Sequence, residues 1–234
     1  MIAALRSLHA PAGLVWRLLD QSDLDRVEAL HRQSIAGVGV QAVKPETRDF
    51  FASLLGGRGQ VIGLTTDQEA GQSLIAYGVL QHALKPGDSP LPLLGLPAHQ
   101  PVLKLAGASV APDWRRHGLQ RLLIEARLRL SGDCGVVFST AAPSNPASWS
   151  SLLACGFVVR GVQLLYGGHP RYMMVRLAPA LDPHGVDAGD AGEEVDSANL
   201  ERQLQLLAQG WRGVAAGSAQ SRIRYQPCGK GQAA

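Results

Sequence analysis

A short segment near the middle of the chain carries basic side chains at a turn where an anion could bind. Residues 109–128 read SVAPDWRRHGLQRLLIEARL, which predicts the end of a strand, a loop and an amphipathic helix. The loop places four residues in a row: Arg115, Arg116, His117 and Gly118. A helix N-terminus leaves backbone N–H groups unpaired, and a glycine there lets phosphate oxygens approach them. Two interpretations are open: a solvated basic turn, or a cradle for the phosphates of a cofactor.

The elements that would position this loop follow from the spacing of the apolar residues. Strands are expected at residues 14–20, 60–66, 73–80, 102–110, 135–140, 157–166 and 171–177. Helices are expected after a cap at Ser22, at residues 44–57 with Pro45 in the first turn and Gly56 after the last, at 119–131, and at 145–156. The order of these elements predicts an α/β (α+β) fold in which helices flank a mixed sheet.

The spacing of the loop resembles the coenzyme A loop of the GNAT family of N-acetyltransferases. Residues 110–120 read V-x-P-x-x-R-x-x-G-L-Q, and the family loop reads Arg/Gln-x-x-Gly-x-Gly/Ala between its fourth strand and a helix. Arg115 and Gly118 match, whereas Gln120 departs from the usual small residue. Asn145, at the start of a helix that Gly-Phe follows, resembles the family's second coenzyme A segment. The resemblance covers roughly residues 14–177.

This resemblance implies a fold, a cosubstrate and a reaction. The fold is GNAT-like, with a mixed, mostly antiparallel central sheet flanked by helices and with strands 4 and 5 splayed. The reaction is transfer of an acetyl group from acetyl-CoA to a primary amine, on a small molecule or a peptide, by direct attack in a ternary complex. The implied cofactor-binding residues are Ala108, Ser109, Val110, Arg115, Arg116, His117, Gly118, Leu119, Gln120 and Asn145.

The residues that would transfer protons are less well defined. Many family members place a tyrosine four residues before the glycine of Gly-Phe, and this chain has Leu152 there. That departure leaves open an alternative function, a non-catalytic acyl-CoA-binding sensor or scaffold module. A backbone N–H near Val110 is expected to act as the oxyanion donor. Tyr166, His169 and Tyr172 are the candidate catalytic side chains, although Tyr172 could instead pack in the sheet and His169 could be solvated.

The composition changes after Leu177, where proline, glycine and acidic residues become frequent. We therefore expect an acetyltransferase domain at residues 1–177. Residues 178–234 are expected to form an acidic linker, a short helix near 197–209 and a flexible C-terminal tail.

The overall composition argues against several classes of protein. A net charge of +3 over 234 residues is small for a nucleic-acid-binding protein. Three widely spaced cysteines, and histidines without ligand spacing, argue against a disulfide framework and against a metal site. No apolar run reaches the length of a membrane span, and no secretory leader is evident. We expect a cytoplasmic protein with no membrane partner, and both a monomer and a homodimer remain open.

Overall fold

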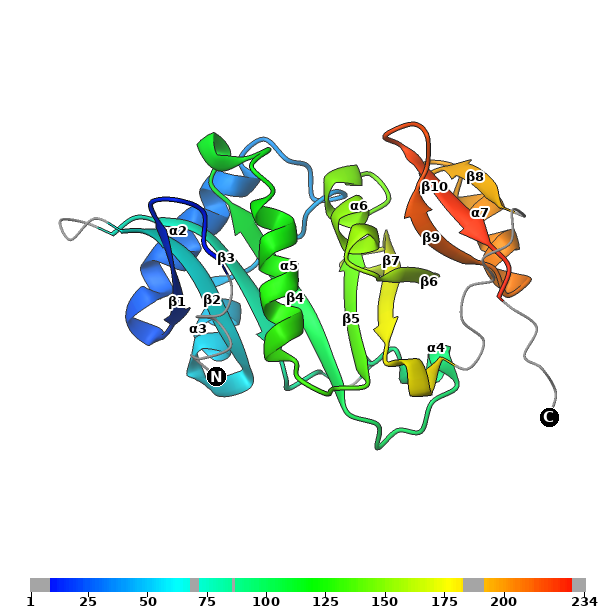
Figure 1. The fold of residues 1–234 in the computed structure, drawn as a ribbon, viewed down its shortest axis with the longest axis horizontal. Helices are drawn as coiled ribbons and strands as arrows, with labels where there is room; N and C mark the ends of the chain where they lie inside the picture. The colour runs from blue at the N-terminus through cyan, green and yellow to red at the C-terminus, as the bar shows by residue number, and fades with distance from the viewer. Residues whose placement is uncertain (1–8, 68–71, 86, 183–191, 229–234) are drawn as a thin grey trace. The chain divides into compact units, whose positions relative to one another are not determined.

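The computed structural model describes residues 9–67, 72–85, 87–182 and 192–228 (Figure 1). The chain divides into two compact units. Unit 1 comprises Met1–Asp88 and Leu103–Gly132, and unit 2 comprises Ser89–Val102 and Asp133–Ala234. Some predictions fall outside the described residues: the N-terminal residues 1–8, part of the expected hairpin turn at 68–71, the centre of the acidic linker at 183–191, and the last residues, 229–234.

The described residues of unit 1 form an antiparallel sheet with helices on both faces. Its strands, in sheet order, are β1 (Leu14–Leu19), β2 (Gly59–Thr66), β3 (Leu74–Gln81) and β4 (Val102–Val110). Its helices are α2 (Leu24–Ile35), α3 (Arg48–Ser53), continued by a π-helical turn (Leu54–Arg58), and α5 (Leu119–Leu130). Leu119 and Leu123 of α5 pack against Ile62 on one face of the sheet. Figure 1 shows α5 in front of the sheet and α2 behind it.

The other face of this sheet is covered by α2 and α3. Val27 of α2 and Phe51 of α3 pack there against Val61 and Tyr77 of the central strands. These four side chains are buried, so the sheet is apolar on both faces. A sheet covered in this way holds β4, and therefore the loop that follows it, on a rigid support.

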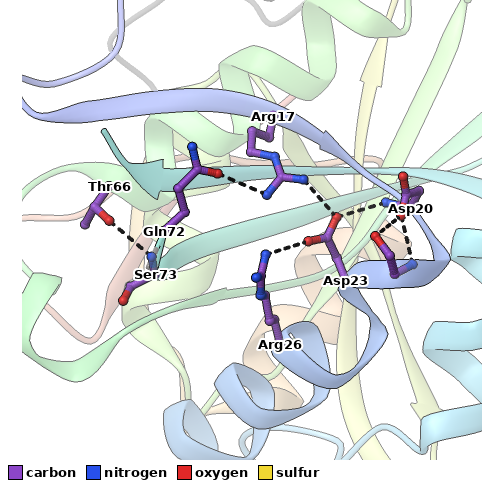
Figure 2. Close-up of polar contacts among 8 residues, drawn as sticks. Arg17, Asp20, Asp23, Arg26, Thr66, Gln72 and Ser73 are labelled. Carbon is purple, nitrogen blue, oxygen red and sulfur yellow. Dashed lines mark hydrogen bonds and ion pairs between the residues drawn. The ribbon is translucent and has the colours of Figure 1, made fainter. Parts of the chain in front are cut away.

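A 3-10 turn (Gln21–Asp23) leads into α2 and begins at a cap built from two aspartates (Figure 2). The carboxylate of Asp20 accepts a hydrogen bond from the backbone N–H of Ser22 at 2.8 Å, and that of Asp23 accepts from the backbone N–H of Asp20 at 3.3 Å. Asp23 is buried and pairs with Arg17 and Arg26. This arrangement is a capping box. The predicted cap at Ser22 is wrong, because the Ser22 hydroxyl instead donates to Asp20 at 2.6 Å. The N-cap of α2 is Asp23, whose side chain makes no capping hydrogen bond within the described residues.

The second helix is shorter than the predicted range of 44–57. Its N-cap is Thr47, whose hydroxyl accepts a hydrogen bond from the backbone N–H of Phe50 at 3.2 Å. Pro45 consequently precedes the helix instead of occupying its first turn. Gly57, with φ of 111°, has the left-handed conformation that was predicted for Gly56. The difference arises because the π-helical turn adds one residue before the chain leaves the helix.

The described residues of unit 2 form a second set of antiparallel pairings. Its strands, in sheet order, are β5 (Val136–Ala141), β7 (His169–Leu177), β6 (Val158–Leu165), β9 (Arg212–Ala216), β10 (Arg222–Gln226) and β8 (Glu193–Asp196). Its helices are α4 (Leu91–Leu94), α6 (Pro146–Ala154) and α7 (Leu200–Ala208). Helix α4 is a single turn inside the proline-rich segment.

The C-terminal part of unit 2 is more ordered than the sequence predicts. The short helix expected near 197–209 is present as α7, but β9 and β10 lie where a flexible tail was expected. In β10, Ile223 and Tyr225 are buried while the arginines beside them are less buried, as in a strand with one covered face. The predicted boundary after Leu177 does not coincide with the division into two units, and it remains a prediction about domain limits.

The predicted fold class is confirmed. The chain has an α/β (α+β) fold in which helices flank a mostly antiparallel sheet, and the strand pairings described above inside each unit are antiparallel. The splay of strands 4 and 5 concerns the two units relative to each other, and it stays a prediction.

Candidate functional site

The predicted phosphate loop lies at the surface of unit 1 between β4 and α5. After β4, residues Pro112–Trp114 form a 3-10 turn, and Arg116 and Gly118 follow with φ of 66° and 74°. A left-handed conformation is uncommon for a residue other than glycine and marks a tight turn. Gly118 is the N-cap of α5, and within the described residues no side chain caps it. The exposed residues 115–118 therefore surround a free helix N-terminus.

The electrostatics of this N-terminus favour an anion. The first turn of α5 holds no acidic residue, while Arg116 and His117 beside it are exposed. The helix dipole adds partial positive charge at the same point. A methyl group built on Gly118 would meet no described atom within 4 Å, so the space beside the turn is open. These features fit a diphosphate held by backbone N–H groups.

The side chain of Arg115 does not point to this open space. Its Nη2 atom donates to the backbone carbonyl of Ser34 at 2.6 Å, at the end of α2. Arg115 thus caps a helix C-terminus, which is a favourable place for a cation. Of the two arginines in the loop, Arg116 is exposed beside the helix N-terminus, whereas Arg115 joins the loop to α2.

The end of β4 presents backbone groups at an edge. Tyr77 pairs with Ser109, and the Ala111 N–H donates to the Ile75 carbonyl at 2.8 Å. Because hydrogen-bonded pairs alternate along an antiparallel ladder, the N–H and C=O groups of Ala108 and Val110 point away from β3. The predicted oxyanion donor, the Val110 N–H, therefore lies on the edge of β4 opposite β3.

A β-bulge lies just before this edge. Gly78 pairs with Ala108, but Leu80 pairs with Leu105, so β4 carries one extra residue. Arg127 of α5, which is only 2% exposed, donates to the Ala106 carbonyl at 3.5 Å and to a carbonyl of β3 at 3.3 Å. The guanidinium thereby donates to one carbonyl on each of the two strands at the bulge. Arg127 was not predicted as a site residue, although an arginine within an apolar helical stripe is a usable signal.

A buried polar network lies directly behind Ser109. The backbone N–H of Glu46 donates to His31 Nε2 at 3.0 Å, and His31 Nδ1 lies 3.0 Å from the Tyr77 hydroxyl. The Ser109 hydroxyl is 3.2 Å from the Tyr77 hydroxyl and 2.8 Å from that of Ser34. The network thus connects α2, β3 and β4. None of its members except Ser109 was predicted as a site residue.

Burial sets the protonation states in this network. It lowers the pKa of the His31 imidazole, and the ammonium group of Lys44 lowers it further. Burial also raises the pKa of the Tyr77 hydroxyl well above its ordinary value. Both groups are therefore neutral near pH 7. A signal for His31 does exist in the sequence, because it shares the inner face of α2 with Val27 and Leu30.

The remaining predicted residues belong to unit 2. Asn145 caps α6, its side chain accepting from the Ser148 N–H at 3.2 Å. Tyr166 lies at the tip of the turn between β6 and β7, with φ of 54° and 37% exposure, and His169 begins β7 half-buried. Tyr172 is fully buried, and its hydroxyl donates to the Ser197 carbonyl at 3.4 Å. Tyr172 is thus packed in the sheet. Leu152 is a buried residue of α6.

Two other features, a metal site and a membrane-spanning helix, are absent from the described residues. There, no group of three or more His, Cys, Asp or Glu side chains is arranged to hold a metal ion. In the same part of the chain, no helix is both long and apolar enough to cross a membrane. Cys134, Cys155 and Cys228 form no disulfide within the described residues.

Comparison with known proteins finds similar structures but no similar sequence. No protein-family model matches the chain, and no curated protein matches its sequence. Solved structures do match. NAA60 from Arabidopsis thaliana, in complex with a bisubstrate analogue, is 19% identical with a TM-score of 0.54, over 70% of this chain and 99% of that one. Spermidine N-acetyltransferase from Vibrio cholerae, in complex with CoA and spermine, is 18% identical with a TM-score of 0.52, over 71% and 96%.

A third match is a GNAT superfamily phosphinothricin acetyltransferase from Sinorhizobium meliloti, in complex with acetyl-CoA. It is 15% identical with a TM-score of 0.51, over 71% of this chain and 90% of that one. At these identities the likeness establishes the fold. The resemblance predicted from the two coenzyme A segments is confirmed at that level: the chain has the fold of the GNAT N-acetyltransferases.

Proposed function

We propose that the chain transfers an acetyl group from acetyl-CoA to a primary amine by direct attack in a ternary complex. The observation that carries this proposal is the exposed, uncapped N-terminus of α5 behind the turn at Arg116 and Gly118. Acetyl-CoA would supply the acetyl group as an activated thioester. The structures that share the fold support this choice, since two of those described above contain CoA or acetyl-CoA.

The proposed roles in unit 1 follow from its geometry. The backbone N–H groups of residues 116–120 would hold the diphosphate, with Arg116 adding charge. The N–H of Arg115 already donates to the Pro112 carbonyl at 3.2 Å. The edge of β4 at Ala108 and Val110 would pair with the extended pantetheine arm in the manner of an added strand. The Val110 N–H would stabilise negative charge that develops on the acyl oxygen.

The proposed acceptor is a primary amine on a small molecule or a peptide. Relatives in fold differ in this respect, since one is a spermidine N-acetyltransferase and another binds a peptide as part of the NatC complex. Tyr166 and His169 are the candidates for proton transfer whose side chains are not fully buried. Asn145 is proposed to contact the cosubstrate as well as capping α6. We also expect a cytoplasmic location, in keeping with cysteines that form no disulfide among the described residues.

A second candidate function is a non-catalytic acyl-CoA-binding module. One observation favours it. Leu152 stands where the resemblance leads us to expect a tyrosine, and this buried leucine has no group that can donate a proton. Incubating the full chain with acetyl-CoA and a panel of amines, and following release of free thiol, separates the two functions. Thiol release together with acetylated product supports the enzyme. Tight binding of coenzyme A with no product from any amine favours the binding module.

Gly118→Glu tests the assignment of the loop. The carboxylate would face the diphosphate, and like charges in contact cost several kcal/mol, so we expect affinity for coenzyme A to fall by about 100-fold or more. Isothermal titration calorimetry measures the loss. Gly118→Asn is the matched control for backbone strain, because asparagine tolerates a left-handed conformation without adding charge. Gly132→Glu places the same charge beyond the other end of α5, where φ is also positive. Equal affinity in all three variants would remove the loop from the site.

A further inference from the structure

The backbone N–H of Glu46 determines which ring nitrogen of His31 carries the hydrogen. The Glu46 N–H donates to His31 Nε2, so this nitrogen is the acceptor and the ring hydrogen is on Nδ1. The Nδ1–H group then faces the Tyr77 hydroxyl at 3.0 Å, with Ser109 Oγ as a second and more distant neighbour at 3.5 Å. The bond that Glu46 makes therefore selects the tautomer of a histidine on a different element.

Three hydroxyls continue the network from His31. Ser109 Oγ lies 3.2 Å from the Tyr77 hydroxyl and 2.8 Å from Ser34 Oγ. Ser34 donates to the backbone carbonyl of His31 at 2.8 Å, which closes the chain on the residue where it began. Each of the three hydroxyls therefore has at least two hydrogen-bonding neighbours, so these polar groups are satisfied.

This arrangement makes His31 a poor proton acceptor. A proton added at Nε2 would place that N–H against the N–H of Glu46 and break the contact. The charged groups nearby are Lys44 and Glu46, which form an ion pair at 2.6 Å in the segment before α3, and Arg115 at the end of α2. The imidazole itself is only 4% exposed. A buried neutral ring whose acceptor is already occupied is suited to hold geometry and is not suited to act as a base.

Ser34 connects this network to the phosphate loop. Its hydroxyl contacts Ser109 on β4, and its carbonyl accepts from Arg115 on the loop. Ser109 and Arg115 stand at the two ends of the turn between β4 and the α5 loop. One residue of α2 therefore bridges both ends of the segment that carries the proposed oxyanion donor, Val110.

We propose that His31, locked as the neutral Nδ1–H tautomer, is a positioning residue for acyl transfer, and that Tyr77, Ser109 and Ser34 transmit its geometry to the end of β4. This proposal depends on the proposed function, because the reaction that His31 would assist is the proposed acetyl transfer. The network fixes Ser109, and through it the direction of the Val110 N–H beside it. The Glu46 contact holds the other side of His31, on the segment between α2 and α3.

The tautomer is tested without any substrate. In the full chain labelled with ¹⁵N-histidine, we expect His31 to show a protonated Nδ1 and an unprotonated Nε2 at pH 7. The His31→Gln variant identifies the signal among the seven histidines by its disappearance. An Nε2–H tautomer, or a doubly protonated ring at that pH, would overturn the proposal whether or not the chain is an enzyme.

Two substitutions then separate the two sides of the ring. H31N places an amide near the Nδ1 position, where it can still donate to Tyr77, and gives up the contact with Glu46. H31Q reaches the Nε2 position, where it can still accept from Glu46, and gives up the donor to Tyr77. We expect kcat to fall about tenfold in H31Q, the size of one lost hydrogen bond, and to stay within about twofold in H31N. H31N should instead raise KM for the amine.

Milder variants keep the proposal testable if either substitution prevents folding. Ser109→Ala and Ser34→Ala each remove one hydroxyl, and each should lower kcat with little change in the affinity for coenzyme A measured by calorimetry. Unchanged kcat in H31Q, Ser109→Ala and Ser34→Ala would overturn the positioning role while leaving the proposed reaction intact. Absence of turnover in the unaltered chain would instead count against the proposed reaction. The tautomer of His31 could still be determined, because the NMR measurement needs no substrate.

Discussion

Tyr77 in unit 1 and Tyr225 in unit 2 are both fully buried, and each hydroxyl is bonded to a side chain from a distant part of the sequence. Tyr77 meets His31 and Ser109. Tyr225 donates to the side-chain oxygen of Gln203 at 2.7 Å. Both networks join a strand to a helix through neutral groups, which avoids the desolvation cost of a buried charge.

The two networks differ in where they end. The chain from Tyr77 reaches Ser34, which accepts from the exposed Arg115 of the phosphate loop. The chain from Tyr225 ends inside unit 2, where the amide of Gln203 donates to carbonyls at residues 196, 197 and 199 at 3.0–3.2 Å. The Ser197 carbonyl also accepts from Tyr172. The same chemistry therefore reaches the proposed phosphate loop in unit 1, whereas in unit 2 it joins only the C-terminal elements to one another.

The largest effect is expected from Gln203→Leu in unit 2. The substitution leaves the buried Tyr225 hydroxyl without its acceptor and removes the amide that donates to the carbonyls before α7, at a cost of about 3 kcal/mol in the free energy of unfolding. Urea denaturation followed by tryptophan fluorescence measures this loss. Gln205→Leu is the matched control on the exposed face of α7 and should stay within about 0.5 kcal/mol of the unaltered chain. Similar losses in both variants would show that the Gln203 network adds nothing.

Removal of the two tyrosine hydroxyls compares the networks directly. Tyr77→Phe and Tyr225→Phe each keep the ring and leave one partner unpaired, so we expect each to lower the free energy of unfolding by about 1–2 kcal/mol. Only Tyr77→Phe should also lower kcat, by about tenfold. Steady-state kinetics on both variants at a temperature where both are folded tests this. If Tyr225→Phe lowered kcat equally, the assignment of the two networks to different tasks would be wrong.

The parts of the molecule that the sequence predicts are those governed by local rules. Asn145 was expected to cap α6 and Gly156 to follow it in a left-handed conformation, and both do. Such signals depend on neighbours within one turn. They also identify most of the helices and strands, and the order of these elements is enough to predict the fold class. The two-strand extension at β9 and β10 was missed because its strands are short and rich in glycine, alanine and arginine.

The network behind the site depends on distant residues, and the sequence does not predict it. His31 is 46 residues from Tyr77 and 78 from Ser109, and only the pairing of β3 with β4 brings them together. The motif likewise predicts Arg115 as a loop residue but not the direction of its side chain, because the acceptor is a carbonyl of α2. Periodicity identifies which face of a helix is buried, but it does not identify the partners of a polar group on that face.

The smallest effect concerns pH. Burial lowers the pKa of His31 below its ordinary value of 6.5, so the unfolded chain takes up this proton first as the pH falls. The stability that His31 contributes is fully present above about pH 6.5 and is lost as the pH falls toward the lowered pKa. In the unit 2 network, burial raises the pKa of Tyr172 and of Tyr225, so neither hydroxyl titrates between pH 7.5 and 5.5.

Hydrogen exchange at these two pH values, corrected for intrinsic rates, distinguishes the two networks. Amides of α2 should lose protection in the unaltered chain at pH 5.5, and the loss should be smaller in His31→Gln because that side chain does not titrate. Amides of α7 should show no difference between the two chains. An equal loss at α2 in both chains would assign the acid sensitivity to other groups, and unit 1 would then resemble unit 2 in having a network that pH does not affect.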